Sequence, residues 1–146
     1  MKPKIMYVEN KSGGDSGLAW IGFVEFSKSG QTVYFDNKAL KKLKNTGISG
    51  NHFNIETGEE YWVSGVKKNG EDRHWAGGGK VMIDKNCIPE YLKLVDFEII
   101  EDKKFEIVEI KATEKSRFTE LENSPVEYEN ESIAARYWDN NRKKLS

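Results

Sequence analysis

Hydrophobic and polar residues alternate along two short runs, LAWIGFVEFSK and QTVYFD, that flank Ser29-Gly30. Alternation with a period of two is typical of a strand, and a short Ser-Gly connection favours a hairpin. With this turn at the tip, Phe26 lies opposite Val33 and Glu25 lies opposite Tyr34. One face carries Trp20, Val24, Phe26, Val33 and Phe35, and the other carries Ile21, Phe23, Glu25, Thr32 and Tyr34. Apolar groups on both faces predict a sheet that curls on itself or is covered on its second side.

A second hairpin is predicted where EEYWVSGVKK and EDRHW flank Asn69-Gly70. Asn-Gly is a strong hairpin signal because both central residues of a type I′ turn need positive φ. In this register Lys68 faces Glu71 and Lys67 faces Asp72, two pairs of opposite charge that contribute about 0.2–1 kcal/mol each. One face of this hairpin then carries Trp62, Ser64, Val66, Arg73 and Trp75.

Weaker signals predict the remaining elements. Apolar or alternating runs indicate strands over residues 4–9, 80–84, 95–100 and 105–110. NCIPEYLKL predicts a brief helix, with Pro89 in the first turn, where its missing N–H costs nothing. NESIAARYWDNNRKK predicts a longer C-terminal helix that Asn130 caps.

The predicted fold is α+β and mainly β. Residues 1–94 are expected to form a small curled antiparallel sheet or barrel built from hairpins. Residues 95–146 are expected to add a strand pair and a C-terminal helix that extends or packs on this core.

Composition narrows the class of protein without naming a function. The 146 residues carry 23 Lys and Arg against 24 Asp and Glu, which excludes a histone-like polycation. Residues 1–80 carry 12 basic against 9 acidic residues, whereas residues 81–146 carry 11 against 15. No apolar run approaches the roughly 18 residues of a membrane-spanning helix, and MKPKIMYVEN lacks the apolar core of a signal peptide. We therefore expect a cytoplasmic protein with no membrane contact.

Residues suited to catalysis are few. His74 shares a strand face with Asp72, which makes this pair the best candidate for acid–base chemistry, although a half-exposed strand histidine is the simpler interpretation. Cys87 precedes a predicted helix start, where backbone amides lower a thiol pKa, but a lone cysteine among apolar neighbours is more typical of a small buried hydrophobe. His52, His74 and Cys87 lack the spacing of a zinc site, so no metal or cofactor is expected.

The most suggestive patch is aromatic and basic. Two tryptophans and an arginine on one hairpin face suit base stacking or the anchor of a protein interface. The alternative is that this face belongs to the core, with Arg73 at its rim. The candidate binding residues are Trp62, Lys67, Asp72, Arg73, His74 and Trp75. A cluster of lysines within residues 38–44 could contact phosphates, although such a run is usually a solvated face.

Three segments carry a resemblance to a known family: MKPKIMYVENKSG, IGFVEFSKSGQTVYF and FNIETGEEYWVSGVKKNGEDR. They lie within the first 84 residues, which resemble a family of small bacterial proteins of uncharacterised role. Members are sometimes labelled as deoxyxylulose-phosphate synthases. We reject that label because such an enzyme needs a far longer chain and a thiamine-diphosphate cleft with an acidic Mg²⁺ motif. The residues from about 95 onward depart from the family pattern.

The leading hypothesis is a non-enzymatic binding module that recognises another macromolecule, for example an immunity- or antitoxin-type inhibitor of a bacterial effector. A basic protein partner would complement the acidic second half of the chain. The first alternative is a small β-barrel that binds nucleic acid through Trp62, Arg73, Trp75 and the lysines of residues 38–44. The second alternative is a small hydrolase-like enzyme that uses Asp72 and His74.

Overall fold

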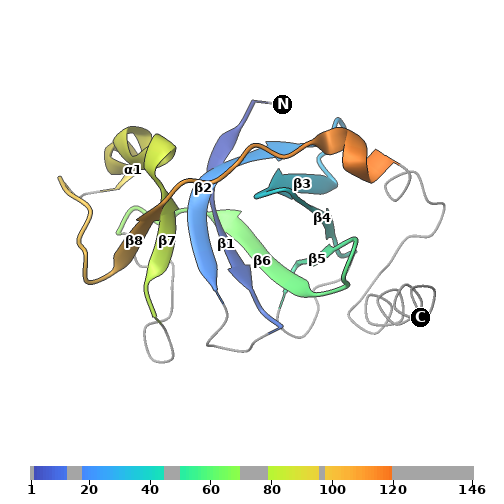
Figure 1. Cartoon of the computed structure of the whole chain (residues 1–146), viewed down its shortest axis with the longest axis horizontal. Helices are drawn as coiled ribbons and strands as arrows, with labels where there is room; N and C mark the ends of the chain where they lie inside the picture. The colour runs from blue at the N-terminus through green and yellow to red at the C-terminus, as the bar shows by residue number, and fades with distance from the viewer. Residues whose placement is uncertain (1, 13–17, 45–49, 70–78, 96–97, 120–146) are drawn as a thin grey trace.

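Six antiparallel strands close into a barrel in the computed structural model, which describes residues 2–12, 18–44, 50–69, 79–95 and 98–119 (Figure 1). The strand order is β1-β6-β5-β4-β3-β2, and β2 pairs back onto β1 to complete the closure. The barrel strands are β1 (Lys4–Asn10), β2 (Ala19–Phe26), β3 (Thr32–Phe35), β4 (Lys38–Lys42), β5 (His52–Asn54) and β6 (Glu60–Gly65). The prediction of a mainly β barrel built from hairpins is confirmed.

Two further strands and a short helix extend the sheet beyond the barrel. β7 pairs in parallel with β2, and β8 pairs in parallel with β7. The helix α1 packs beside these strands (Figure 1). The bounds are β7 (Val81–Asp84), the 3-10 turn η3 (Lys85–Cys87), α1 (Ile88–Leu94), β8 (Phe105–Val108) and the 3-10 turn η4 (Lys115–Phe118).

The predicted register of the first hairpin is confirmed, since Glu25 pairs with Tyr34 and Phe26 pairs with Val33. The connection is longer than the two residues expected, because the outermost backbone bond joins the Ser27 N–H to the Thr32 carbonyl. A turn within the loop brings the Gly30 N–H onto the Ser27 carbonyl, at 2.9 Å between N and O. Glycine suits the position because its φ is 77°.

A tight turn that the sequence analysis did not anticipate joins β3 to β4. Asp36 and Asn37 both adopt positive φ, at 48° and 60°, between the paired residues Phe35 and Lys38. Positive φ at both central positions is the type I′ arrangement, and Asp and Asn are among the few side-chain-bearing residues that tolerate it. Most of the lysine cluster noted within residues 38–44 belongs to strand β4, which follows this turn.

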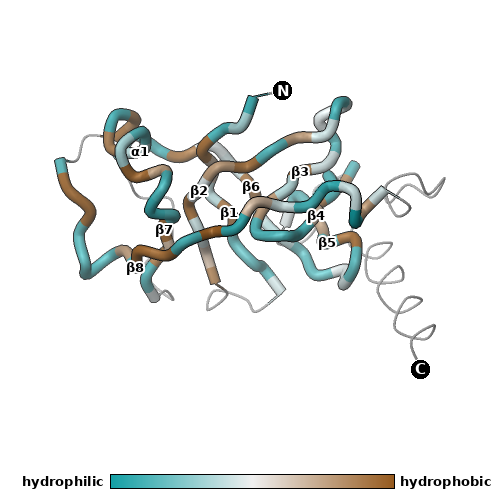
Figure 2. Tube along the Cα trace, turned by 45° about the horizontal axis from the view of Figure 1, so that its top comes forward, coloured by the Kyte–Doolittle hydropathy of each residue, from teal (hydrophilic) through white to brown (hydrophobic). Residues whose placement is uncertain are grey.

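The apolar face predicted for the first hairpin lies inside the barrel. The interior cluster consists of Val8, Val24, Val33, Phe35, Leu40, Tyr61 and Val63, with Met6, Trp20, Phe26 and Ile110 packed against it. The opposite face is also covered, as the pattern required. A first outer cluster joins β1, β2, β7, β8 and α1, and a second outer cluster over β3, β4 and β5 is closed by Phe118. Hydrophobic residues along β2 and β8 are visible in Figure 2.

One predicted strand pair takes a different form. Residues 95 and 98–100 lie outside any strand, and β8 pairs in parallel with β7. The described residues therefore do not form the antiparallel pair expected between 95–100 and 105–110, and residues 96–97 lie outside them. The Tyr91 and Phe105 rings pack edge to face, with 6.1 Å between centroids, and this contact holds β8 beside α1 and β7. The return strand expected over residues 71–75 and the helix expected over 130–144 lie outside the described residues.

β2 divides one of its edges between two neighbours. Trp20 and Ile21 pair with β7, whereas Glu25 and Phe26 pair with β3. A fork therefore opens at Gly22, and residues 109–119, here named the strap, run across β2 from β8 to η4 (Figure 1). A Cβ atom on Gly22 would lie 3.1 Å from the Phe35 ring and 3.2 Å from Cδ1 of Ile110.

The fork predicts that Gly22→Val lowers the free energy of unfolding by about 1–3 kcal/mol, since a branched side chain forces Ile110 and Phe35 apart. Chemical denaturation followed by circular dichroism measures this change. Gly65→Val is the matched control, because it also places valine in a barrel strand but meets no atom within 4 Å of the new Cβ. Equal destabilisation by the two substitutions would contradict the packing argument.

Candidate binding site

A cavity of about 540 Å³ opens at the fork of β2, and we name it the fork cavity. Its walls combine carboxylates with aromatic rings and two lysines. The carboxylates are Glu25, Asp36, Asp84 and Glu90, the rings are Phe23, Tyr34 and Phe35, and the lysines are Lys2 and Lys111. Pro3, Asn86, Ile110, Ala112 and Thr113 complete the lining.

The alternation of the first hairpin places the main side chains of this cavity. Phe23 and Glu25 lie on the outer face of β2, because the intervening Val24 belongs to the barrel interior. Tyr34 lies directly across from Glu25 on β3, so a carboxylate and an aromatic ring stand side by side on the same face. Within the hairpin, Phe23, Glu25 and Tyr34 thus line the cavity from the outer face, whereas Phe35 lines it from the interior cluster.

Asp84 lines the cavity from the end of β7. It is 5% exposed, and its carboxylate accepts from the backbone N–H of Asn86 at 3.1 Å, which caps η3. The Asn86 amide donates to the same oxygen at 3.2 Å, and the Ile110 N–H lies 3.5 Å from it. These contacts join η3 and the end of β7 to the strap.

Two lysines from outside the lining contact the carboxylates of the cavity. Lys115 Nζ lies 2.8 Å from Glu25 Oε2 and 5.5 Å from the centroid of the Tyr34 ring. Lys38 Nζ lies 3.1 Å from Asp36 Oδ2, and 5.9 Å from the Trp20 ring. Two of the four carboxylates of the site, those of Glu25 and Asp36, therefore already accept from ammonium groups.

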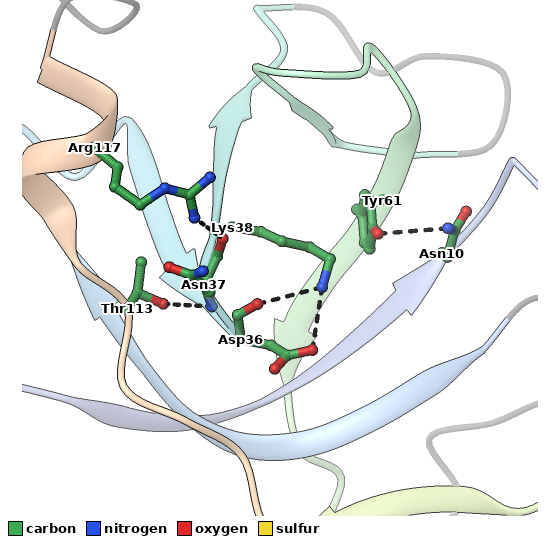
Figure 3. A network of polar contacts seen from close by, with 7 residues as sticks. All are labelled: Asn10, Asp36, Asn37, Lys38, Tyr61, Thr113 and Arg117. Carbon is green, nitrogen blue, oxygen red and sulfur yellow. Dashed lines mark hydrogen bonds and ion pairs between the residues drawn. The ribbon is translucent and has the colours of Figure 1, made fainter.

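The strap is tied to the β3–β4 turn by a polar network (Figure 3). The Asn37 N–H donates to Thr113 Oγ1 at 2.9 Å, and the Arg117 guanidinium donates to the Asn37 carbonyl at 3.2 Å. Arg117 also forms an ion pair with Glu56, at 3.2 Å. Phe118, which follows, is fully buried in the outer cluster over β3, β4 and β5.

A polar end of the barrel interior lies next to this network (Figure 3). The Asn10 amide donates to the Tyr61 hydroxyl at 3.4 Å and to Glu59 at 3.2 Å. Burial, followed by the nearby charge of Glu59, raises the pKa of Tyr61 to about 12. Tyr61 therefore stays a neutral phenol at physiological pH.

The aromatic and basic patch predicted from the sequence is only partly described by the structure. Trp62 is half-buried and packs against the outer cluster of β1, β2, β7 and α1, and Lys67 is exposed. The other candidates, Asp72, Arg73, His74 and Trp75, lie outside the described residues. For Trp62, the packing agrees with the alternative that this face belongs to the core.

The two remaining candidates for chemistry, His52 and Cys87, are buried. Burial, with a smaller contribution from the charge of Lys42, lowers the pKa of His52 to about 4, and Nδ1 lies 2.8 Å from the side-chain oxygen of Asn51. Burial and the charge of Asp84 raise the pKa of Cys87 to about 12, and its thiol faces the Ile21 carbonyl. Cys87 is a small buried hydrophobe, as the sequence favoured.

Within the part of the chain that the structure describes, no group of three or more His, Cys, Asp or Glu side chains is arranged to hold a metal ion. Among the same residues, no helix has the length and apolar character needed to cross a membrane. The chain matches no protein-family model and shows no significant similarity to a curated protein or a solved structure. The resemblance to a family of small bacterial proteins stays a prediction.

The buried histidine predicts a pH dependence of stability. The pKa of His52 is about 4 in the folded chain against 6.5 when unfolded, so the unfolded state binds more protons between these values. The free energy of unfolding should fall as pH decreases from 6.5 to 4, by roughly 3 kcal/mol from this group. In His52→Gln, the free energy of unfolding measured by chemical denaturation should change less with pH between 6.5 and 4. The same pH dependence in this variant and in the unmodified chain would contradict the role of His52.

The buried cysteine predicts that the native thiol resists modification. The chain has one cysteine, so a chromogenic disulfide reagent reports on Cys87 alone. We expect negligible reaction with the folded protein near pH 8 and one equivalent of thiol released after unfolding in guanidinium. Rapid reaction before unfolding would contradict the burial described for this side chain.

Proposed function

We propose that the chain is a non-enzymatic binding module that recognises a basic segment of a partner protein through the fork cavity. The observation that carries this proposal is the placement of the Glu25 carboxylate beside the Tyr34 ring at the edge of a cavity of about 540 Å³. A volume of this size suits one or two inserted side chains.

The chemistry of the walls favours a cationic side chain. Carboxylates accept charge-assisted hydrogen bonds from guanidinium and ammonium groups, and aromatic faces attract the same cations by about 0.5–2 kcal/mol. The aliphatic stems of lysine and arginine also pack well on apolar surface, which Phe23 and Ile110 provide here. The lining carries four carboxylates against two lysines, Lys2 and Lys111. A basic segment therefore satisfies the carboxylates together with the rings and the apolar surface, whereas an anionic ligand would pair only with the two lysines.

The titratable groups with shifted pKa values support a binding role over catalysis. The pKa of His52 moves to about 4, and those of Tyr61 and Cys87 move to about 12, so each is poorly suited to proton transfer near neutral pH.

An immunity- or antitoxin-type inhibitor acting in the cytoplasm is one concrete form of such a module. Two alternatives are left to experiment: a hydrolase-like enzyme that uses Asp72 and His74, and a protein that binds nucleic acid.

A titration followed by backbone amide NMR tests this function. The probes are a short peptide that alternates leucine with lysine and arginine, the same peptide with glutamate at the charged positions, and a single-stranded DNA oligonucleotide. We expect the basic peptide to shift the amides of Phe23, Glu25 and Tyr34, with affinity that falls as salt rises. Glu25→Gln should weaken binding by about fivefold to tenfold, which corresponds to roughly 1–1.4 kcal/mol.

Glu106→Gln is the matched control, because it removes the same charge from an exposed position on β8 that does not line the cavity. Its affinity for the basic peptide should equal that of the unmodified chain. Binding of the oligonucleotide without the basic peptide would contradict the proposal and favour the nucleic-acid alternative. Equal loss in both variants would show that net charge, and not the cavity, attracts the peptide.

A further inference from the structure

The strap is held to the barrel at points on either side of Lys115. Before it, the Ile110 side chain packs against the interior cluster next to Gly22, and Thr113 accepts from the Asn37 N–H. After it, Phe118 is fully buried in the outer cluster over β3, β4 and β5. These contacts fix the path of the strap without using the Lys115 ammonium group.

Lys115 makes two contacts with residues that line the fork cavity. Its Nζ atom lies 2.8 Å from the Glu25 carboxylate and 5.5 Å from the centroid of the Tyr34 ring. A carboxylate and an aromatic face are the two partners that a cation from another protein would seek there. Lys115 thus makes, within the chain, the contacts that we propose for a cation of the partner.

The geometry of this ion pair allows exchange. The side chains of Lys115 and Glu25 are 49% and 42% exposed, and an exposed pair of this kind is weakly held. Because the strap is fixed by other contacts, the lysine side chain can rotate into solvent while Ile110 and Phe118 stay in place. Release of the cation therefore does not require release of the strap.

We infer that Lys115 is an intramolecular competitor for the fork cavity. In the free protein its ammonium group occupies Glu25 and Tyr34, and a lysine or arginine of the partner replaces it on binding. This inference rests on the proposed function, and it adds that the affinity for a basic partner is limited by the chain itself. It also assigns Glu25 as the shared acceptor of the internal and external cations.

Affinity measurements on the full chain with the basic peptide probe test the competition. Lys115→Met removes the ammonium group and keeps an unbranched apolar stem, so the dissociation constant should decrease by about twofold to fivefold. Lys115→Arg keeps the competing cation and should bind like the unmodified chain. In the amide NMR spectrum of Lys115→Met, the signals of Ile110 and Phe118 should stay unshifted, because the strap remains docked.

Lys85→Met is the matched control. It removes one positive charge from another exposed ion pair of the strap, where Lys85 Nζ lies 3.5 Å from Glu109 Oε2, and neither residue lines the cavity. Its dissociation constant should stay unchanged. A gain in affinity confined to Lys115→Met supports the competition, including the case where only that variant binds measurably.

Two results would overturn the inference, and they differ from failure of the proposed function. Equal gains in Lys85→Met and Lys115→Met would show a general charge effect. Peptide binding that depends on Glu25 but is unchanged in Lys115→Met would leave the binding function standing and remove the competition. If neither the unmodified chain nor any lysine variant binds the basic peptide, the proposed function fails and the inference fails with it.

Discussion

The division of one edge of β2 between β3 and β7 is the constraint on which the rest of the structure depends. Pairing with β1 along its other edge closes the barrel, so β2 belongs to the barrel and to the extension at the same time. Its two neighbours diverge at Gly22, because β3 follows the curvature of the barrel and β7 continues toward α1 (Figure 1). The fork cavity and the seat of Ile110 both result from this divergence.

Local pattern was sufficient to predict the hairpin and its two faces. Alternation from Trp20 to Phe35 separated the hairpin residues that pack in the barrel interior from those on the outer face, and the register that pairs Glu25 with Tyr34 followed from the turn position. That register already placed a carboxylate beside an aromatic ring on the mixed face, which is the main signal of the fork cavity in the sequence. The Asp36-Asn37 turn was not predicted, although both residues are among the few with side chains that tolerate positive φ.

The contribution of Asp84 to the site was not predictable in this way. Asp84 contacts the strap only because β7 pairs in parallel with β2, and β8 pairs in parallel with β7, across long separations in sequence. Alternation in residues 95–100 and 105–110 suggested a local hairpin instead. The choice between the two pairings depends on how Tyr91 and Phe105 pack in the outer cluster, and a single run of residues does not contain that information.

The same geometry explains why the candidate site lies outside the barrel. A six-stranded barrel of this kind fills its interior with side chains, and here valines, leucine and aromatic rings do so. On the outer face, packing constrains Ile21, which is buried under α1 and β7, but leaves Glu25 half-exposed beyond the fork. A carboxylate at that position does not destabilise the core, because its charge stays in contact with water or pairs with a cation. The side chains suited to binding therefore lie at the fork, between the part of β2 that pairs with β7 and the part that pairs with β3.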